Sequence, residues 1–568
     1  MATLALRKAP LAFEERLIGE GIHPLLARIY AARGVRSKAE LQDDFASLIP
    51  PAQLTNAENA AVILADAIAA DLRLLIVADY DCDGATACAV GLRALAAFGA
   101  RVDYLVPDRF RFGYGLTPEI VALAAERKAD IIITVDNGIA SVEGVAAANA
   151  LGMRVVITDH HLPGATLPLA AAIVNPNQPD CAFPSKCIAG VGVMFYVMLA
   201  LRAELRKRGA FSSKPEPALA GLLDLVALGT VADVVKLDRN NRLLVSQGLR
   251  RIRSGRMQPG VRALFAVAAR DPARAATFDL GFLVAPRLNA AGRLDDMSLG
   301  IECLATEDFG QALNMARRLD ELNRERRTIE AEMQGQADGL VAGIDVGDRF
   351  AVCLFDPRWH QGVIGILAGR LKDRHHRPVM AFAPAQAAHP DGELRGSGRS
   401  IAGLHLRDAL DALDRRAPGL LLRFGGHAAA AGVTIRATDL ERFSELFEVV
   451  VRELVGPTQL TQTVETDGPL SVSYMSLETA RLLESQIWGQ GFPQPLFCDH
   501  FSVRGQRLVG EKHIKAKLDL GGRTVEAMKF NATTPLPAAI RAAYRLSMDE
   551  YNGLQGLRLV IEHWEPAP

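Results

Sequence analysis

Little in this sequence points to a secreted or membrane protein. Its seven cysteines are scattered, with no CxxC pair and no spacing typical of disulfide scaffolds, which predicts reduced thiols in a cytosolic protein. No apolar run is long enough to span a membrane, and charges interrupt the N-terminal apolar residues too early for a signal-peptide core. We therefore expect a soluble cytoplasmic protein that does not associate with membranes.

The chain also has little net charge and no internal repeat. Its 64 Lys and Arg residues nearly balance 65 Asp and Glu residues, for a net charge of −1. A nucleic-acid site would therefore have to be a local basic patch. With 568 residues, of which 49% are hydrophobic, the chain is too apolar to be disordered and too long for a single core. Several domains are expected.

Short β-branched runs alternate with alanine-rich stretches between residues 72 and 175. The strands predicted there cover residues 72–78, 102–106, 131–135, 155–158 and 172–174, and the helices cover residues 86–98, 118–127 and 142–150. This alternation predicts a parallel sheet with helices on both faces. Further helices over residues 190–207 and 217–231 are expected to extend this domain.

The rest of the chain changes character twice. A proline-free stretch over residues 308–340 predicts a long connector helix. A second α/β pattern follows, with a helix over residues 362–372, and the final part alternates at the strand period of a small barrel. We thus predict a multidomain α/β protein with an N-terminal segment (1–49), a parallel-sheet domain with a helical extension (50–307), the connector helix (308–340), a smaller α/β domain (341–458) and an OB-fold-like β-barrel (459–568).

Acidic residues and histidines directly follow three of the predicted strands. The motifs are Asp79-Tyr-Asp-Cys-Asp-Gly84, Asp136-Asn-Gly138 and Asp159-His-His161. Because the carboxyl ends of parallel strands share one sheet edge, the three motifs should meet in space. Each motif alone is more typical of an ordinary turn or loop, but three of them at one edge indicate a functional site.

Converging carboxylates repel one another unless cations neutralise them. A mixture of carboxylate and imidazole ligands suits Mn²⁺ or Mg²⁺ better than a structural zinc ion, for which thiolates would be expected. We expect two ions, since a carboxylate between them gives the separation of about 3.5–4 Å used in phosphoester hydrolysis. The sequence therefore predicts a two-metal hydrolytic centre.

These motifs resemble motifs I to III of the DHH phosphoesterases, and Gly229-Thr-Val-Ala-Asp-Val234 resembles motif IV. Gly425-Gly-His-Ala-Ala-Ala-Ala-Gly432 is similar to the signature of the DHH-associated domain. Segments similar to those of the RecJ branch are Pro286-Arg-Leu-Asn-Ala-Ala-Gly-Arg293, Trp359-His-Gln-Gly-Val-Ile-Gly365, Ser397-Gly-Arg-Ser400 and the stretch over residues 487–497. The resemblance covers most of residues 50–568.

The resemblance implies roles for the motif residues. The metal ligands would be Asp81, Asp83, Asp136, His160 and Asp233, with Asp79 near the first ion, where many members of the superfamily carry a histidine. Asp136 would bridge the two ions and act with His160 and His161 in catalysis. His161 would contact the scissile phosphate, and Asp159 would orient His160.

Candidate contacts to the substrate backbone are arginines and neighbouring polar residues. Arginine offers a bidentate fork to phosphate, although structural ion pairs are the alternative for each arginine. The predicted substrate-binding residues are Arg109, Arg287, Asn289, Arg293, Gln361, Arg399, Ser400 and His427.

The predicted barrel carries a local excess of positive charge. Residues 504–529 contain seven Lys or Arg and three acids, as expected for an OB-fold that tracks a single strand, although a solvated sheet surface is the alternative. The predicted grip on nucleic acid consists of Arg504, Lys512, Lys515 and Lys517, and Phe501 and Phe530 are candidates for base stacking.

The activity that the resemblance implies is hydrolysis of single-stranded DNA from its 5′ end to 5′-mononucleotides, in repair and recombination. The resemblance also implies a single-strand-binding protein and a helicase as partners, and we expect a monomer. One alternative is DHH chemistry on short oligoribonucleotides, cyclic dinucleotides or polyphosphate, whose enzymes look shorter and lack the barrel. A non-catalytic binding scaffold is disfavoured because the motif carboxylates are all present.

Overall fold

The computed structural model describes residues 3–108, 112, 114–342, 346–385, 392–551 and 554–567. They form two compact units. The large unit comprises Leu4–Gly292, Asp296–Asp320 and Glu465–Pro568. The small unit comprises Arg293–Asp295 and Glu321–Val464, together with the first residues of the chain. No helix in the described ranges has the length and apolar character needed to cross a lipid bilayer.

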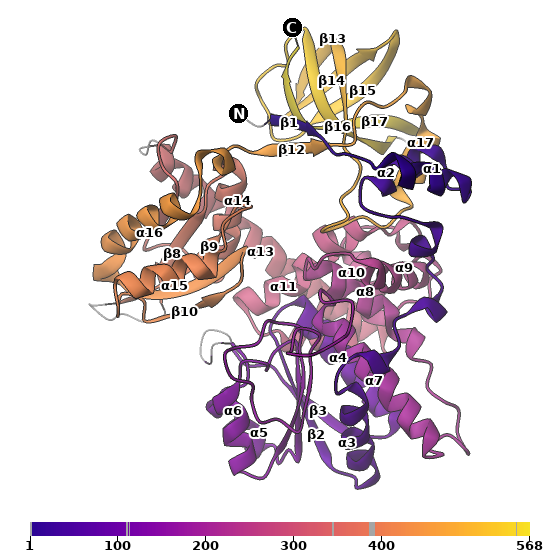
Figure 1. The fold of residues 1–568 in the computed structure, drawn as a ribbon, viewed down its shortest axis with the longest axis vertical. Coiled ribbons are helices and arrows are strands. Elements are labelled where there is room, and N and C mark those ends of the chain that lie inside the picture. The colour runs from indigo at the N-terminus through magenta and orange to yellow at the C-terminus, as the bar shows by residue number, and fades with distance from the viewer. Residues whose placement is uncertain are drawn as a thin grey trace. The chain divides into compact units, whose positions relative to one another are not determined.

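The large unit contains a five-stranded parallel sheet in the order β3-β2-β4-β5-β6. Figure 1 labels β2 and β3 of this sheet. Its strands are β2 (Arg73–Ala78), β3 (Arg101–Leu105), β4 (Ile131–Val135), β5 (Arg154–Thr158) and β6 (Ala172–Val174). All five predicted strands are confirmed to within one residue at each end. The chain reverses its direction across the sheet between β2 and β4, and open α/β sheets bind their ligands at such a switch point.

Helices cover both faces of this sheet. They are α3 (Ala57–Ala69), α4 (Cys82–Phe98), α5 (Pro118–Glu126), α6 (Val142–Ala150) and α7 (Gly190–Lys207). Leu75 and Val77 pack into the core under α5 and α6, whereas Ile76 faces Gly91 of α4 and Met194 of α7. Strands buried on both faces have continuous apolar sequences, which explains why the sequence pattern located them so closely.

A helical extension follows the sheet. Its helices are α8 (Leu223–Ala232), α9 (Arg239–Arg253), α10 (Pro259–Val267), a π-helical segment (Asp279–Val284), α11 (Ala285–Leu294) and α12 (Ser298–Ala305). The helix predicted over residues 217–231 begins only at Leu223, after a 3-10 turn, because Pro217 and Gly221 disfavour a continuous helix. The predicted connector is confirmed as α13 (Phe309–Ala342), a helix of 34 residues.

The small unit has a five-stranded sheet in the order β10-β11-β9-β8-β7, in which only β7 and β8 are parallel. Its elements are β7 (Val352–Phe355), α14 (Ile364–His375), β8 (Val379–Pro384), β9 (Glu393–Arg399), α15 (Leu406–Arg416), β10 (Arg423–Gly426), β11 (Ala430–Arg436) and α16 (Leu440–Leu454). Phe382, Phe443 and Phe447 lie at the centre of its core. This architecture confirms the predicted second α/β domain.

The C-terminal strands close into a barrel in the order β13-β14-β15-β17-β16 (Figure 1). They are β13 (Phe497–Val509), β14 (His513–Leu520), β15 (Arg523–Lys529), β16 (Ala539–Tyr551) and β17 (Leu554–Pro566). Ile514, Ala516 and Leu518 point into the barrel, while Lys517 between them is exposed. The predicted barrel is therefore confirmed, with the alternation expected from the sequence.

The N-terminal segment packs against residues that precede the barrel. Its elements are β1 (Thr3–Leu6), α1 (Leu11–Gly19) and α2 (Pro24–Ala31), and the segment before the barrel contains β12 (Thr463–Thr466) and α17 (Leu477–Glu484). The rings of Tyr30 and Phe492 stack with their centroids 5.9 Å apart, and the Tyr30 hydroxyl donates to Gln486 Oε1 at 2.7 Å. A buried ion pair joins Arg33 Nη1 to Asp467 Oδ1 at 2.7 Å.

Candidate metal centre

The three acidic motifs meet at one edge of the parallel sheet, as predicted. Asp79 follows β2, Asp136 follows β4 and Asp159 follows β5. Asp81 is the N-cap of α4, where its Oδ1 accepts hydrogen bonds from the backbone N–H groups of Asp83 at 2.9 Å and Gly84 at 3.0 Å. This capping directs the motif I carboxylates into the switch-point crevice.

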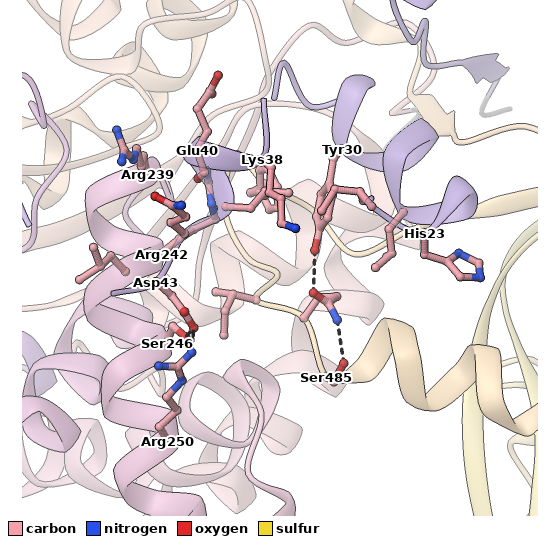
Figure 2. Close-up of a pocket in the computed structure, with 18 of the residues that line it drawn as sticks. His23, Tyr30, Lys38, Glu40, Asp43, Arg239, Arg242, Ser246, Arg250 and Ser485 are labelled. Carbon is pink, nitrogen blue, oxygen red and sulfur yellow. Dashed lines mark hydrogen bonds and ion pairs between the residues drawn. The ribbon is translucent and has the colours of Figure 1, made fainter. Parts of the chain in front are cut away.

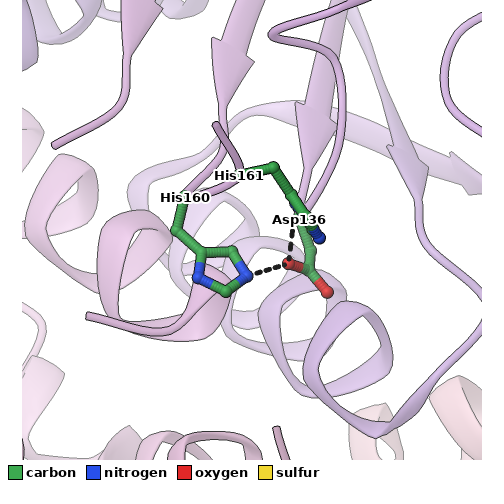
Figure 3. Close-up of side chains that lie close together, drawn as sticks. All are labelled: Asp136, His160 and His161. Carbon is green, nitrogen blue, oxygen red and sulfur yellow. Dashed lines mark ion pairs between the residues drawn. The ribbon is translucent and has the colours of Figure 1, made fainter. Parts of the chain in front are cut away.

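Asp136 lies at the middle of the cluster. Its carboxylate lies beside the imidazoles of His160 and His161 (Figure 3), with Oδ1 3.0 Å from His160 Nε2 and 4.0 Å from His161 Nδ1. On the far side, His160 Nε2 lies 3.5 Å from Asp233 Oδ2. The potential ligand atoms form three groups, in each of which all atoms lie within 4.8 Å of one another: Asp79, Asp81 and Asp136; Asp83, His160 and Asp233; and Asp136, His160 and His161.

The start of α7 holds the motif I carboxylate in place. Asp83 Oδ2 accepts the backbone N–H of Gly190 at 2.6 Å, and Oδ1 accepts that of Val191 at 2.9 Å. A Cβ on Gly190 would lie 2.6 Å from Asp136 Oδ1, so only glycine fits there. Sequence reasoning missed this contact, since these residues lie 107 positions apart and nothing near Gly190 marks it as part of a site.

Burial and mutual repulsion shift the carboxylates of this cluster. Burial, and next the charges of Asp83 and Asp81, raise the pKa of Asp136 far above its usual range, and the same causes raise the pKa of Asp233. Burial and the charge of Asp81 raise the pKa of Asp83 to about 7, despite its two backbone hydrogen bonds. Divalent cations would relieve this repulsion and keep the carboxylates ionised.

The donor set fits such cations. Within the described ranges, the buried Asp136 Oδ1 accepts no hydrogen bond of good geometry, although buried polar atoms are normally satisfied. Carboxylate oxygens, which make up most of the donor set, are typical ligands of Mn²⁺ and Mg²⁺. All six predicted metal ligands lie in these groups, and their assignment to particular ions stays a prediction.

One predicted orienting contact is wrong. Asp159 Oδ1 lies 2.8 Å from His161 Nδ1, whereas from His160 it accepts the backbone N–H at 2.7 Å. Burial opposes ionisation of Asp159, but its contacts with His161 outweigh that effect and lower its pKa. Conversely, although burial favours the neutral imidazole, Asp159 raises the pKa of His161 to about 9. The adjacent histidines at this strand end thus point to different partners. The ring of His161 contacts Asp159, and the ring of His160 contacts Asp136.

Tyr114 is a further neighbour of the centre that the sequence did not reveal. Its hydroxyl donates to the backbone carbonyl of Asp136 at 2.9 Å and lies 3.1 Å from His161 Nδ1. Tyr114 lies shortly after Arg109, the predicted substrate contact, in the chain. Arg109 lies outside the described residues.

The predicted substrate contacts of α11 have structural partners in the large unit. Arg287 Nε donates to Asp320 Oδ1 at 2.9 Å. This is the structural ion pair that the sequence left open as the alternative to a phosphate contact. Asn289 Oδ1 accepts the backbone N–H of Cys82 at 2.8 Å, and a Cβ on Gly292 would lie 1.9 Å from the Tyr80 carbonyl oxygen. This segment therefore braces motif I, and its contact with a substrate stays a prediction.

The remaining predicted substrate contacts lie in the small unit. Arg293 Nη1 donates to the carbonyl of Gly362, next to Gln361, at 3.2 Å. Arg399 lies at the end of β9, opposite Ala430 and beside the start of α14, where a Cβ on Gly365 would lie 3.0 Å from its Nη2. The other residues at this end of the sheet are Ser400, which donates to Leu404 O, and His427, which is exposed. Arg399, Ser400 and His427 thus lie at one end of this sheet.

The barrel residues predicted to bind nucleic acid differ in exposure and in ion pairing. Lys512, Lys517 and Arg504 are exposed, and Arg504 lies 3.6 Å from Asp519. Lys515 forms an ion pair with Glu526 at 2.8 Å. Phe501 is buried against Tyr544, so the prediction that it stacks on bases is wrong. Its ring faces inward on β13, whereas Phe530 is exposed.

A separate pocket of about 530 Å³ in the large unit contains none of the predicted site residues. The N-terminal segment, α9 and residues 485–492 line it (Figure 2). Much of its positive charge has structural partners: Arg250 pairs with Asp43, and Arg242 donates to Leu237 O at 3.0 Å and lies 4.2 Å above the Phe492 ring. These contacts tie the N-terminal segment to α9.

Comparison with known proteins agrees with this architecture. Residues 73–230 match the DHH family N-terminal domain, residues 347–453 the DHHA1 domain and residues 466–563 the RecJ OB domain. The chain is 50% identical to the single-stranded-DNA-specific exonuclease RecJ of Dickeya dadantii over 99% of each chain.

Two solved structures that match this chain are of a relative in complex with a divalent metal ion. The crystal structure of Thermus thermophilus RecJ with Mn²⁺ matches with a TM-score of 0.83 and 30% identity, covering 100% of this chain and 79% of that one. The structure of the same protein with Mg²⁺ matches with a TM-score of 0.77 and 28% identity, covering 100% and 78%. Since sequence and fold agree over the full length, the chain belongs to the RecJ family of single-stranded-DNA-specific exonucleases, whose catalytic domain is of the DHH type.

Proposed function

We propose that the chain is a metal-dependent exonuclease that hydrolyses single-stranded DNA from the 5′ end, releasing 5′-mononucleotides during repair and recombination. The observation that carries this proposal is the position of Asp136 in two of three ligand groups at the switch point of the sheet. Identity of 50% over the full length to a single-stranded-DNA-specific exonuclease supports the choice of substrate.

The candidate metal ligands form two sets, one for each of two ions, and Asp136 is shared between them. Asp79 and Asp81 would hold one divalent ion, and Asp83, His160 and Asp233 would hold a second, with Asp136 serving both. When bound, such ions lower the pKa of a water ligand and stabilise charge on the attacking and leaving oxygens. His161, whose pKa the contact with Asp159 raises against the effect of burial, would bind a phosphate oxygen of the scissile group.

Product analysis on end-labelled strands tests this function. With Mn²⁺ or Mg²⁺, a 5′-labelled oligonucleotide should release labelled mononucleotide in the first turnover, while a 3′-labelled one should shorten progressively. EDTA should abolish both reactions because the ligand cluster would lose its cations. The reverse labelling pattern would contradict the polarity, and full activity in EDTA would contradict the metal assignment.

The closed barrel favours a long strand over small phosphodiesters. The same ligand cluster could cleave short oligoribonucleotides or cyclic dinucleotides. These substrates are too short to reach the exposed lysines of the barrel as well, whereas a long single strand can bind both. A single-strand-binding protein and a helicase are the partners that we propose for such an enzyme, acting as a monomer in the cytoplasm. The free state of all seven cysteines supports a reducing compartment.

The barrel lysines give a second test. Changing Lys512 and Lys517 together to alanine should weaken binding to long single strands and reduce the log–log salt slope by about 1.4, at about 0.7 for each lost phosphate contact. Lys515→Ala is the matched control, since Glu526 already pairs with Lys515, and should change the slope less. The measurement is affinity against salt for long and very short strands. An unchanged slope in the double variant would exclude the barrel as a DNA grip.

A further inference from the structure

Two phenylalanines of the large unit are unusually exposed. Phe278 is 53% exposed and Phe282 68% exposed, more than any other phenylalanine in the described part of the chain. Their rings stack with centroids 5.0 Å apart and planes inclined by 22°. Phenylalanine is normally buried, and such a pair in contact with water is expected to have a binding role.

Buried neighbours and hydrogen bonds anchor the backbone that carries these rings. They lie at the start of and within the π-helical segment Asp279–Val284, whose Leu280 and Val284 are fully buried. Asp279 anchors the segment, accepting Arg270 Nε at 2.8 Å and the backbone N–H of Ala276 at 2.8 Å. π-Helical turns occur frequently at functional sites. The segment therefore presents both rings outward from a fixed base.

The two rings line a pocket of about 330 Å³ in the large unit. Its opposite wall includes Val231 and Val234, which flank the metal-ligand candidate Asp233. A Cβ on Gly281 would lie 3.3 Å from Val231 Cγ1, so the π-helical segment packs directly on the end of α8. The pocket therefore lies against the end of α8, at the two residues that flank Asp233 in the chain.

Val234, at the end of α8, has a strained backbone conformation. Its φ is +61°, a left-handed conformation that a β-branched residue rarely adopts. Its side chain is nevertheless 63% exposed and lines the pocket with the phenylalanines. Asp233 and Val234 therefore lie at a fixed, strained turn that offers a carboxylate to the metal centre and an apolar surface to the pocket.

We propose that Phe278 and Phe282 form a platform on which bases of the single-stranded substrate stack beside the metal centre. This inference rests on the proposed function and deepens it. A strand whose backbone lies at the Asp136 edge carries its neighbouring bases past Asp233 and Val234. Every base has an aromatic face, so stacking on phenylalanine binds a strand without reading its sequence. In a duplex those faces are already covered by neighbouring base pairs, so the platform favours single strands.

The test is a set of paired substitutions measured by equilibrium binding and KM. Phe278→Ala with Phe282→Ala should lower affinity for single-stranded oligonucleotides about tenfold for each base that stacks, equivalent to about 1.4 kcal/mol. Phe278→Trp with Phe282→Trp should retain wild-type affinity. Phe278→Leu with Phe282→Leu keeps apolar surface but no ring and should bind as weakly as the alanine pair. Leu169→Ala, at an 86% exposed site of the large unit, is the control and should change nothing.

Abasic oligonucleotides locate the contact. In the wild-type protein, one or two abasic positions near the 5′ end should weaken binding, and the alanine pair should lose this dependence. The platform is overturned if the leucine pair binds like wild type, because an apolar docking surface would then suffice, or if the alanine pair binds normally. A wild-type protein that does not cleave single strands in Mn²⁺ would instead refute the proposed function itself.

Discussion

Replacing Asp136 with asparagine is expected to reduce turnover at least about a thousand-fold while preserving the fold. In two of the three ligand groups Asp136 supplies an oxygen, so its loss disturbs both sides of the proposed metal centre. Metal-ion catalysis supplies several kcal/mol, and each 1.36 kcal/mol corresponds to a tenfold change in rate. Asparagine tolerates the φ of +63° at this position, which makes it a better variant than alanine.

A stability measurement separates this effect from misfolding. Because burial and neighbouring carboxylates raise the pKa of Asp136, Asp136→Asn should raise the Tm in EDTA and weaken the stabilisation produced by added Mn²⁺. Glu126→Ala, at an exposed acid of α5, is the control and should alter neither turnover nor Mn²⁺ stabilisation. A folded Asp136→Asn protein with a tenth of wild-type turnover would refute the two-metal assignment.

Gly190→Ala is expected to reduce activity about a hundred-fold without altering any charged group. The new methyl group would lie 2.6 Å from Asp136 Oδ1 and 2.7 Å from its Cβ, a separation that forces either α7 or the carboxylate to move. Displacements of about 1 Å at reacting groups cost on the order of a hundred-fold in rate. The same movement would lengthen the hydrogen bonds from Gly190 and Val191 to Asp83.

The control for this variant is another helical glycine. Gly335→Ala lies in α13, where an added Cβ meets no atom within 4 Å, so it should leave activity unchanged and stabilise the helix slightly. The measurements are turnover and the Mn²⁺ concentration needed for half-maximal activity. Wild-type values for both in Gly190→Ala would show that the close approach of α7 to Asp136 is unimportant for catalysis.

The catalytic edge could be predicted because neighbouring residues in the sequence determine both the strands and the motifs that follow them. The three strands that precede the acidic motifs, β2, β4 and β5, are mostly apolar and buried, and each motif begins at the residue after its strand. Topology alone therefore brings Asp79, Asp136 and Asp159 together. The local sequence did not determine which of the two histidines contacts Asp159. Whether His160 or His161 faces Asp159 depends on backbone direction after β5, which composition does not specify.

Contacts between distant segments also escaped prediction. Nothing near Gly190 indicates that its amide binds Asp83, and nothing near Phe501 indicates that its ring faces inward. Register in β13 shifts at a bulge between Val503 and Gly505, which interrupts the alternation used to assign faces. Phe278 and Phe282 were missed because an apolar residue in a helical stretch is normally a core residue.

The packing of α2 on the segment before the barrel also has a consequence for biosynthesis. Tyr30 meets Gln486 and Arg33 meets Asp467 across 456 and 434 positions of the chain. At translation rates of about 5–20 residues per second, the partners of α2 emerge from the ribosome roughly 20–90 s after it does. During that interval the aromatic face of Tyr30 is without its stacking partner Phe492. The nascent N-terminal helices are therefore a natural client surface for chaperones until synthesis is almost complete.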